Sequence, residues 1–102
     1  MLASFSIVPV GTGEELKADV AAVLELIDRS GLPYKLGAMQ TTVEGDEEKV
    51  MALIMACHRK MRERASRVLT HITIDDRAGA AGRLSGKVKD VETVLGRELS
   101  RE

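Results

Sequence analysis

The chain has 102 residues, which suits one domain and is too short for two. Its 15 basic and 16 acidic residues nearly balance, which argues against a partner such as nucleic acid or an anionic membrane. Phe5 and Tyr34 are the only aromatic residues, so platforms for stacking nucleic-acid bases are scarce and the core must be largely aliphatic.

The cysteine content and the hydropathy pattern indicate the cellular compartment in which the protein is expected. The single cysteine, Cys57, cannot form an internal disulfide, and no Cys or His cluster has the spacing of metal ligands. No run of about 18 apolar residues could cross a membrane. The N-terminal residues lack the basic and apolar segments of a secretory signal. We therefore expect a cytoplasmic protein with no bound metal.

The first predicted element is a strand from Leu2 to Val10. Its residues alternate in part, so that Ala3, Phe5 and Ile7 share one face. Pro9 has no amide donor and therefore marks either the end of the strand or an exposed edge.

A helix follows the turn Gly11-Thr12-Gly13. Thr12 and Glu15 have the spacing of a capping box, and Gly31 is placed to end the helix in a left-handed conformation. This region resembles a phosphate-binding turn, but it lacks a lysine, and capping explains it better. The apolar stripe of the helix is Leu16, Val20, Val23, Leu24 and Ile27.

Two short strands, Tyr34 to Leu36 and Gln40 to Glu44, are predicted around a tight turn at Gly37-Ala38. A second helix should begin with Asp46 as N-cap. Its apolar stripe is Val50, Leu53, Ile54, Cys57 and Met61.

The last predicted strand, Val68 to Asp75, alternates again, and a further amphipathic helix should start at about residue 84. The order is therefore β-α-β-β-α-β followed by a helix. Helical crossovers of this kind join parallel strands in a split βαβ sandwich, with the helices on one face of the sheet. We expect residues 1–102 to form one such α/β domain.

Cys57 and His58 are adjacent, which raises the possibility of a nucleophile and its base. Neighbouring helical residues point about 100° apart, so the two side chains cannot easily hydrogen-bond to each other. Cys57 is predicted to be a small core residue and His58 to lie at the edge of the helix surface. No nucleophile, acid–base pair or metal site has suitable spacing, so we expect no catalytic residues and no enzymatic activity.

The most informative stretch is Gln40-Thr41-Thr42-Val43-Glu44-Gly45, beside Ser4 and Ser6 of the first strand. Hydroxyl groups and a carboxylate are the partners that an aminopyrimidine needs for its amine and ring nitrogens. The same residues would equally suit a polar sheet face at a subunit interface. Chemistry alone leaves both alternatives open.

Three segments resemble a known family: SFSIVPVGTG, SGLPYKLGAMQTTVEG and RVLTHITIDDR occur in the order and spacing of the thiamine-binding-protein family. Its tandem-domain relatives are the YkoF-type proteins, which bind thiamine and hydroxymethylpyrimidine. The resemblance runs from about Ala3 to Val94. It implies a ferredoxin-like fold, a four-stranded antiparallel sheet with helices on one face, assembled as a homodimer or homotetramer through sheet faces and edges.

The resemblance also implies ligand-binding residues. Thr41 and Glu44 match the family element T-x-x-E-G, and Ser6 matches a serine before the proline in the tandem-domain relatives. Met39 is expected to cover the ligand ring, and Gln40 replaces a glycine of many members, which would narrow or re-aim a pocket. Expected positions alone add three further candidates: Ser4, Tyr34 and Thr42.

The expected function is therefore that of a non-enzymatic binding protein for thiamine or its hydroxymethylpyrimidine precursor, with no other cofactor. The alternative is a structural or regulatory homo-oligomer without a metabolite ligand, which uses the polar sheet face only for assembly.

Overall fold

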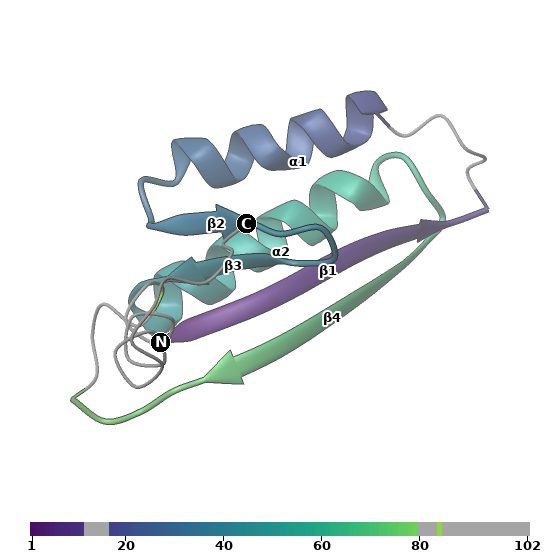
Figure 1. Ribbon diagram of the computed structural model, residues 1–102. Helices are drawn as coiled ribbons and strands as arrows, with labels where there is room; N and C mark the ends of the chain where they lie inside the picture. The colour runs from purple at the N-terminus through teal and green to yellow at the C-terminus, as the bar shows by residue number, and fades with distance from the viewer. Residues whose placement is uncertain (12–16, 80–83, 85–102) are drawn as a thin grey trace.

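The computed structural model describes residues 1–11, 17–79 and 84. Two helices and a four-stranded antiparallel sheet make up this part of the chain (Figure 1), which confirms the ferredoxin-like βαββαβ arrangement. The predicted C-terminal helix lies outside the described residues, apart from Leu84. The elements are β1 (Leu2–Val10), α1 (Lys17–Arg29), β2 (Tyr34–Leu36), β3 (Thr41–Glu44), α2 (Glu47–Arg62) and β4 (Arg67–Asp75).

The strands are ordered β2-β3-β1-β4, so β1 lies inside the sheet and β4 lies at an edge. Because side chains alternate between the two faces of a strand, residues that lie opposite each other in the register share one face of the sheet. Phe5 lies opposite Thr41 on β3 and Ile72 on β4, on the face toward the helices. Ser4 lies opposite Thr42 and Thr73 on the other face, which we call the outer face.

The core lies between the helices and the inner face of the sheet. Every residue of the predicted α2 stripe is buried, because apolar residues three and four apart share one side of a helix. α1 makes its principal contacts with α2, whereas α2 packs on β1 and β4. The buried cluster is Ala3, Phe5, Val23, Ile27, Val43, Val50, Leu53, Ile54, Cys57 and Met61.

The end of α1 follows its predicted signal and the start of α2 differs from it, whereas the predicted capping box of Thr12 and Glu15 lies outside the described residues. Gly31 has φ 76° directly after α1, as expected for a residue that ends a helix in the left-handed region. Asp46 occupies the N-cap position of α2, but its side chain makes no capping hydrogen bond. Its carboxylate lies instead 3.9 Å from Lys49 Nζ, three residues further along the chain.

Pairing along β1 is unequal on its two sides. The strand pairs with β4 over its whole length, from Leu2 to Val10, but with β3 only from Leu2 to Phe5. Pro9 therefore lies within the strand, on the part with no β3 partner, which decides in favour of the exposed-edge reading of this proline. Within the described residues, no helix is long and apolar enough to cross a membrane.

The core assignment can be tested with two neighbouring residues of α2. Ile54 is fully buried, whereas Met55 is 40% exposed. Ile54→Ala should lower the free energy of unfolding by about 2–5 kcal/mol, because it removes buried methyl groups and leaves a cavity. Met55→Ala should change it by less than about 0.5 kcal/mol. Guanidinium denaturation measures both, and equal losses would contradict the assignment.

Candidate functional site

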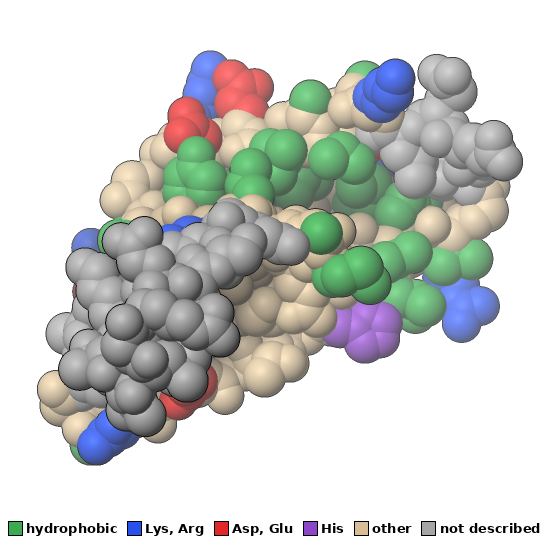
Figure 2. Space-filling view, in the orientation of Figure 1, with side chains coloured by type: hydrophobic (Ala, Val, Ile, Leu, Met, Phe, Trp, Pro, Cys, Tyr) green, Lys and Arg blue, Asp and Glu red, His purple; other side chains and the backbone are tan. Residues whose placement is uncertain are grey.

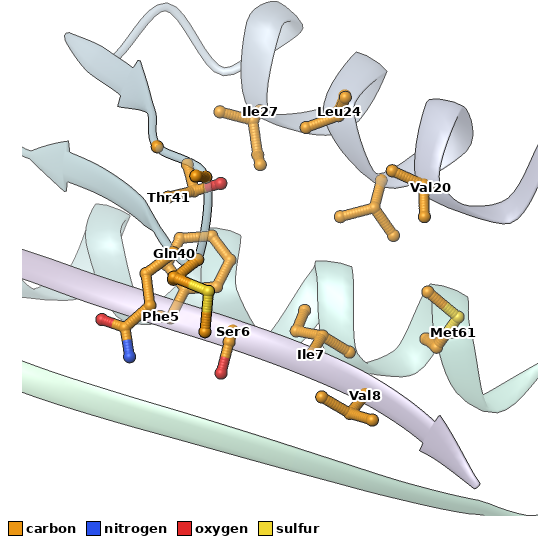
Figure 3. Close-up of a pocket in the computed structure, with 14 residues that line it drawn as sticks. Phe5, Ser6, Ile7, Val8, Val20, Leu24, Ile27, Gln40, Thr41 and Met61 are labelled. Carbon is orange, nitrogen blue, oxygen red and sulfur yellow. The ribbon is translucent and has the colours of Figure 1, made fainter. Parts of the chain in front are cut away.

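A pocket of about 340 Å³ lies between α1 and β1, where β3 no longer pairs with β1 (Figure 3). We call it the α1–β1 pocket. β1, α1, the β2–β3 turn and the end of α2 all contribute to its walls. The lining residues are Phe5, Ser6, Ile7, Val8, Val20, Val23, Leu24, Ile27, Gly37, Ala38, Met39, Gln40, Thr41 and Met61.

Apolar side chains form most of this lining. Val20, Val23, Leu24 and Ile27 repeat at helical spacing along one side of α1, and Met61 comes from the last turn of α2. Figure 2 shows hydrophobic side chains gathered in a band between α1 and β1. Small-molecule sites are concave and largely apolar, with a few placed polar groups, and the α1–β1 pocket has this character.

The polar groups of the pocket come from the β2–β3 turn and the start of β3. Thr41 is half-buried, and its hydroxyl points toward α1 in Figure 3. Gln40 also lines the pocket, but the Ser4 hydroxyl donates a hydrogen bond of 2.5 Å to Gln40 Oε1, and Figure 3 shows the carboxamide directed away from α1. The turn itself is closed by Gly37 N–H, which donates to the Gln40 carbonyl at 2.9 Å.

Three of the seven predicted ligand-binding residues meet in this pocket: Ser6, Met39 and Thr41. Met39 is 87% exposed, so its side chain lies at the entrance. Ser6 lies opposite His71 on the outer face of β1, and Figure 3 shows its hydroxyl pointing away from α1. Ser6 therefore contributes to the rim rather than to the interior.

Ser4, Thr42 and Glu44 lie elsewhere, on the outer face. Glu44 pairs with Leu2, four positions along β1 from Ser6, so these two side chains are about 13 Å apart. Thr41 and Glu44 are three residues apart in one strand and therefore point to opposite faces. The three residues with family matches, Ser6, Thr41 and Glu44, therefore do not converge in one recess.

Tyr34 also lies outside the pocket. Its hydroxyl donates a hydrogen bond of 2.8 Å to Asp28 Oδ1, which ties β2 to the end of α1. This hydrogen bond to the carboxylate raises the pKa of Tyr34, because it holds the phenolic proton. The contact makes Tyr34 part of the support of α1.

Sequence reasoning missed the α1 side of the pocket. The sequence places Val20, Leu24 and Ile27 on the apolar stripe of the helix, and apolar periodicity cannot distinguish a core wall from a pocket wall. Gln40 was expected to affect a pocket because it replaces a glycine, and it does line the pocket.

Cys57 and His58 do not form a dyad. Cys57 is fully buried, and burial raises the pKa of its thiol to about 11. His58 is half-buried, and its Nδ1 lies 2.6 Å from Thr70 Oγ1 on β4. Both residues therefore serve the contact between α2 and its neighbours. Among residues 1–11, 17–79 and 84, no three His, Cys, Asp or Glu side chains are grouped to hold a metal ion.

Comparison with known sequences decides the family. A family model described as thiamine-binding protein matches residues 3–92. The chain belongs to the thiamine-binding-protein family. A UPF0045 protein of Mycobacterium tuberculosis is 36% identical over 96 residues, which cover 93% of this chain and 94% of that protein. A UPF0045 protein of Bacillus subtilis, YqgV, is 33% identical over 100 residues, covering 92% and 96%.

Solved structures of similar fold agree with this family assignment. A hypothetical protein of Methanocaldococcus jannaschii has a TM-score of 0.80 and 26% identity, and covers 88% of this chain and 93% of its own. A Thermotoga maritima protein, provisionally described as a thiamine biosynthesis or salvage protein, has a TM-score of 0.76 and 28% identity, covering 88% and 96%.

The raised thiol pKa predicts how Cys57 affects stability at high pH. An unfolded thiol ionises near its ordinary value of 9.0, whereas the folded thiol stays protonated up to about 11. Between these values the unfolded state binds fewer protons, so the stability that Cys57 contributes falls as pH rises. Urea denaturation from pH 8 to 11 should show the advantage of the wild type over Cys57→Ala shrinking above pH 9. A constant difference would contradict the buried, protonated thiol.

Proposed function

We propose that this member of the thiamine-binding-protein family is a non-enzymatic binding protein that takes thiamine or its hydroxymethylpyrimidine precursor into the α1–β1 pocket. The observation that carries the proposal is the pocket itself. Its volume of about 340 Å³ falls within the roughly 300–1,000 Å³ of small-molecule sites. The family match and the name of the Thermotoga maritima neighbour support the choice of ligand.

The chemistry of the walls suits a flat heteroaromatic ring. Apolar side chains of α1 would contact one side of the ring, and Met39 at the entrance has a flexible thioether side chain that adapts to an aromatic surface. The Thr41 hydroxyl would hydrogen-bond to a polar ring substituent. Ser6 would contribute at the rim.

The remaining candidate residues have weaker support as ligand contacts. Ser4 would act through Gln40, to which it is hydrogen-bonded. Tyr34 would act by holding α1 through Asp28. Thr42 and Glu44 would reach a ligand only on the outer face.

Binding to this pocket is tested by two adjacent threonines that differ in the face they occupy. Thr41→Val should weaken the binding of hydroxymethylpyrimidine about five- to tenfold, because one ligand hydrogen bond is lost at almost constant volume. Thr42→Val, on the opposite face, should leave affinity unchanged. Isothermal titration calorimetry measures both, and a thermal shift compares thiamine, the precursor and a sugar of similar size.

Two results would contradict binding of the ligand in the α1–β1 pocket. Weaker binding in Glu44→Gln or Thr42→Val, with unchanged binding in Thr41→Val, would move the ligand to the outer face. Absence of selective stabilisation by thiamine or its precursor would remove the proposed ligand altogether.

Self-association is a second part of the proposal. Val8 and Leu69 lie opposite each other on the outer face and are 48% and 41% exposed. Burying such residues against another copy removes apolar surface from water. We propose a cytoplasmic homodimer or homotetramer. The same observation favours the alternative function, a structural or regulatory assembly without a metabolite ligand.

Two leucines of similar exposure test the assembly. Leu69→Glu should shift the protein toward smaller species in sedimentation velocity, because it places a charge in the outer-face contact. Leu36→Glu is the control, since Leu36 is 44% exposed but pairs with Thr41 on the opposite face. A wild-type protein that sediments as a monomer would refute the assembly. An assembly that binds neither thiamine nor its precursor would favour the alternative function.

A further inference from the structure

The main chain of β1 presents alternating residues to its two neighbouring strands. The Met1 amino group donates to the Gly45 carbonyl at 2.9 Å, and Gly45 N–H donates to the Met1 carbonyl at 3.0 Å. In an antiparallel ladder, pairs that exchange both hydrogen bonds recur at every second residue. Ala3 and Phe5 therefore direct their main-chain N–H and C=O groups toward β3, and the next residue to do so is Ile7.

Ile7 has no strand opposite it on the β3 side. Continuing the register of Phe5 with Thr41 would place Met39 opposite Ile7, but β3 begins at Thr41. Met39 lies instead in the turn closed by Gly37 and Gln40 and is 87% exposed. Within the described residues, neither N–H nor C=O of Ile7 has a β-ladder partner on this side.

Pro9 keeps this edge unpaired. It is the next residue after Ile7 whose main chain faces the β3 side, and its nitrogen carries no hydrogen to donate. An incoming strand would therefore find one residue with a donor and an acceptor and then a position without a donor. Such an edge disfavours pairing with a further strand.

The unpaired groups lie at the α1–β1 pocket. Ile7 lines it together with Phe5 and Thr41, and Figure 3 shows Ile7 on the strand below Leu24 and Val20 of α1. The N–H and C=O of one extended residue point to the same side of the strand, because in an antiparallel ladder both groups bond to the same residue of the neighbouring strand. They can therefore meet two adjacent polar atoms of one ring.

We propose that the main-chain N–H and C=O of Ile7 are the recognition element of the pocket, and that they select a ring in which an exocyclic amine adjoins a ring nitrogen. The N–H donates to the ring nitrogen, and the C=O accepts from the amine. This inference rests on the proposed function for the location of the site, and it names the group that distinguishes an aminopyrimidine from other flat rings.

Amide hydrogen exchange provides the first test. In the free wild-type protein, Ile7 N–H should exchange faster than Ser6 and Val8 N–H, which face β4. Adding hydroxymethylpyrimidine should protect Ile7 selectively. An Ile7 amide that is already protected without ligand would overturn the inference, because another segment or another copy would then occupy the edge.

Backbone chemistry provides the second test. An amide-to-ester replacement at Ile7 removes the N–H, and it should weaken the binding of hydroxymethylpyrimidine about tenfold while changing the melting temperature little. The matched ester at His71, which lies opposite Ser6 on β4 and does not line the pocket, removes a hydrogen bond between β4 and β1. It should lower the melting temperature and leave binding unchanged at temperatures where the protein is folded.

A ligand analogue provides the third test. The analogue of hydroxymethylpyrimidine that lacks the amine should bind the wild type about tenfold more weakly, because the Ile7 carbonyl loses its donor. Equal binding of the ligand to the wild type and the Ile7 ester would overturn the role of Ile7 and leave the proposed function intact. If the wild type binds neither thiamine nor hydroxymethylpyrimidine, the proposed function fails, and the role of Ile7 fails with it.

Discussion

The unequal pairing of β1 is the constraint on which the rest of the site depends. β1 is held along its whole length by β4, so it stays extended to Val10, but β3 supports it only as far as Phe5. A strand that continues beyond one of its neighbours leaves main-chain groups without ladder partners on that side. Pro9 makes this arrangement less costly, because one of the positions facing the gap has no N–H to satisfy.

The position of α1 turns this gap into a pocket. α1 packs mainly against α2, with Val23 and Ile27 buried. Polar contacts secure both of its ends: Arg64 Nε donates to Asp19 Oδ2 at 3.0 Å, and Asp28 accepts from Tyr34. These contacts are exposed or partly exposed and are individually worth little, but they oppose tilting of the helix toward the sheet. The pocket thus follows from how the helix is supported more than from a special residue inside it.

Much of the fold could be predicted from the periodicity of apolar residues and from the glycine and proline residues that end helices and strands. The alternation of β1 and β4 and the apolar stripe of α2, from Val50 to Met61, decide which faces are buried, and the observed elements agree. The candidate site was harder to predict from the sequence than the fold. Alternation in the stretch Thr41 to Glu44 already assigns its first and last residues to opposite faces, so the error there was to treat nearness in sequence as nearness in space. The main chain of Ile7 could not have been singled out, because its exposure depends on where β3 ends.

The pocket and the outer face are not independent surfaces. Ser4 belongs to the outer face by its pairing with Thr42 and Thr73, yet its hydroxyl donates to the carboxamide of Gln40, a residue that also lines the pocket. A contact that covers the outer face near Ser4 would therefore restrict Gln40, and a ligand that engages Gln40 would restrict Ser4. Because such coupling is reciprocal in free energy, the proposed assembly and the proposed ligand binding would share this one hydrogen bond.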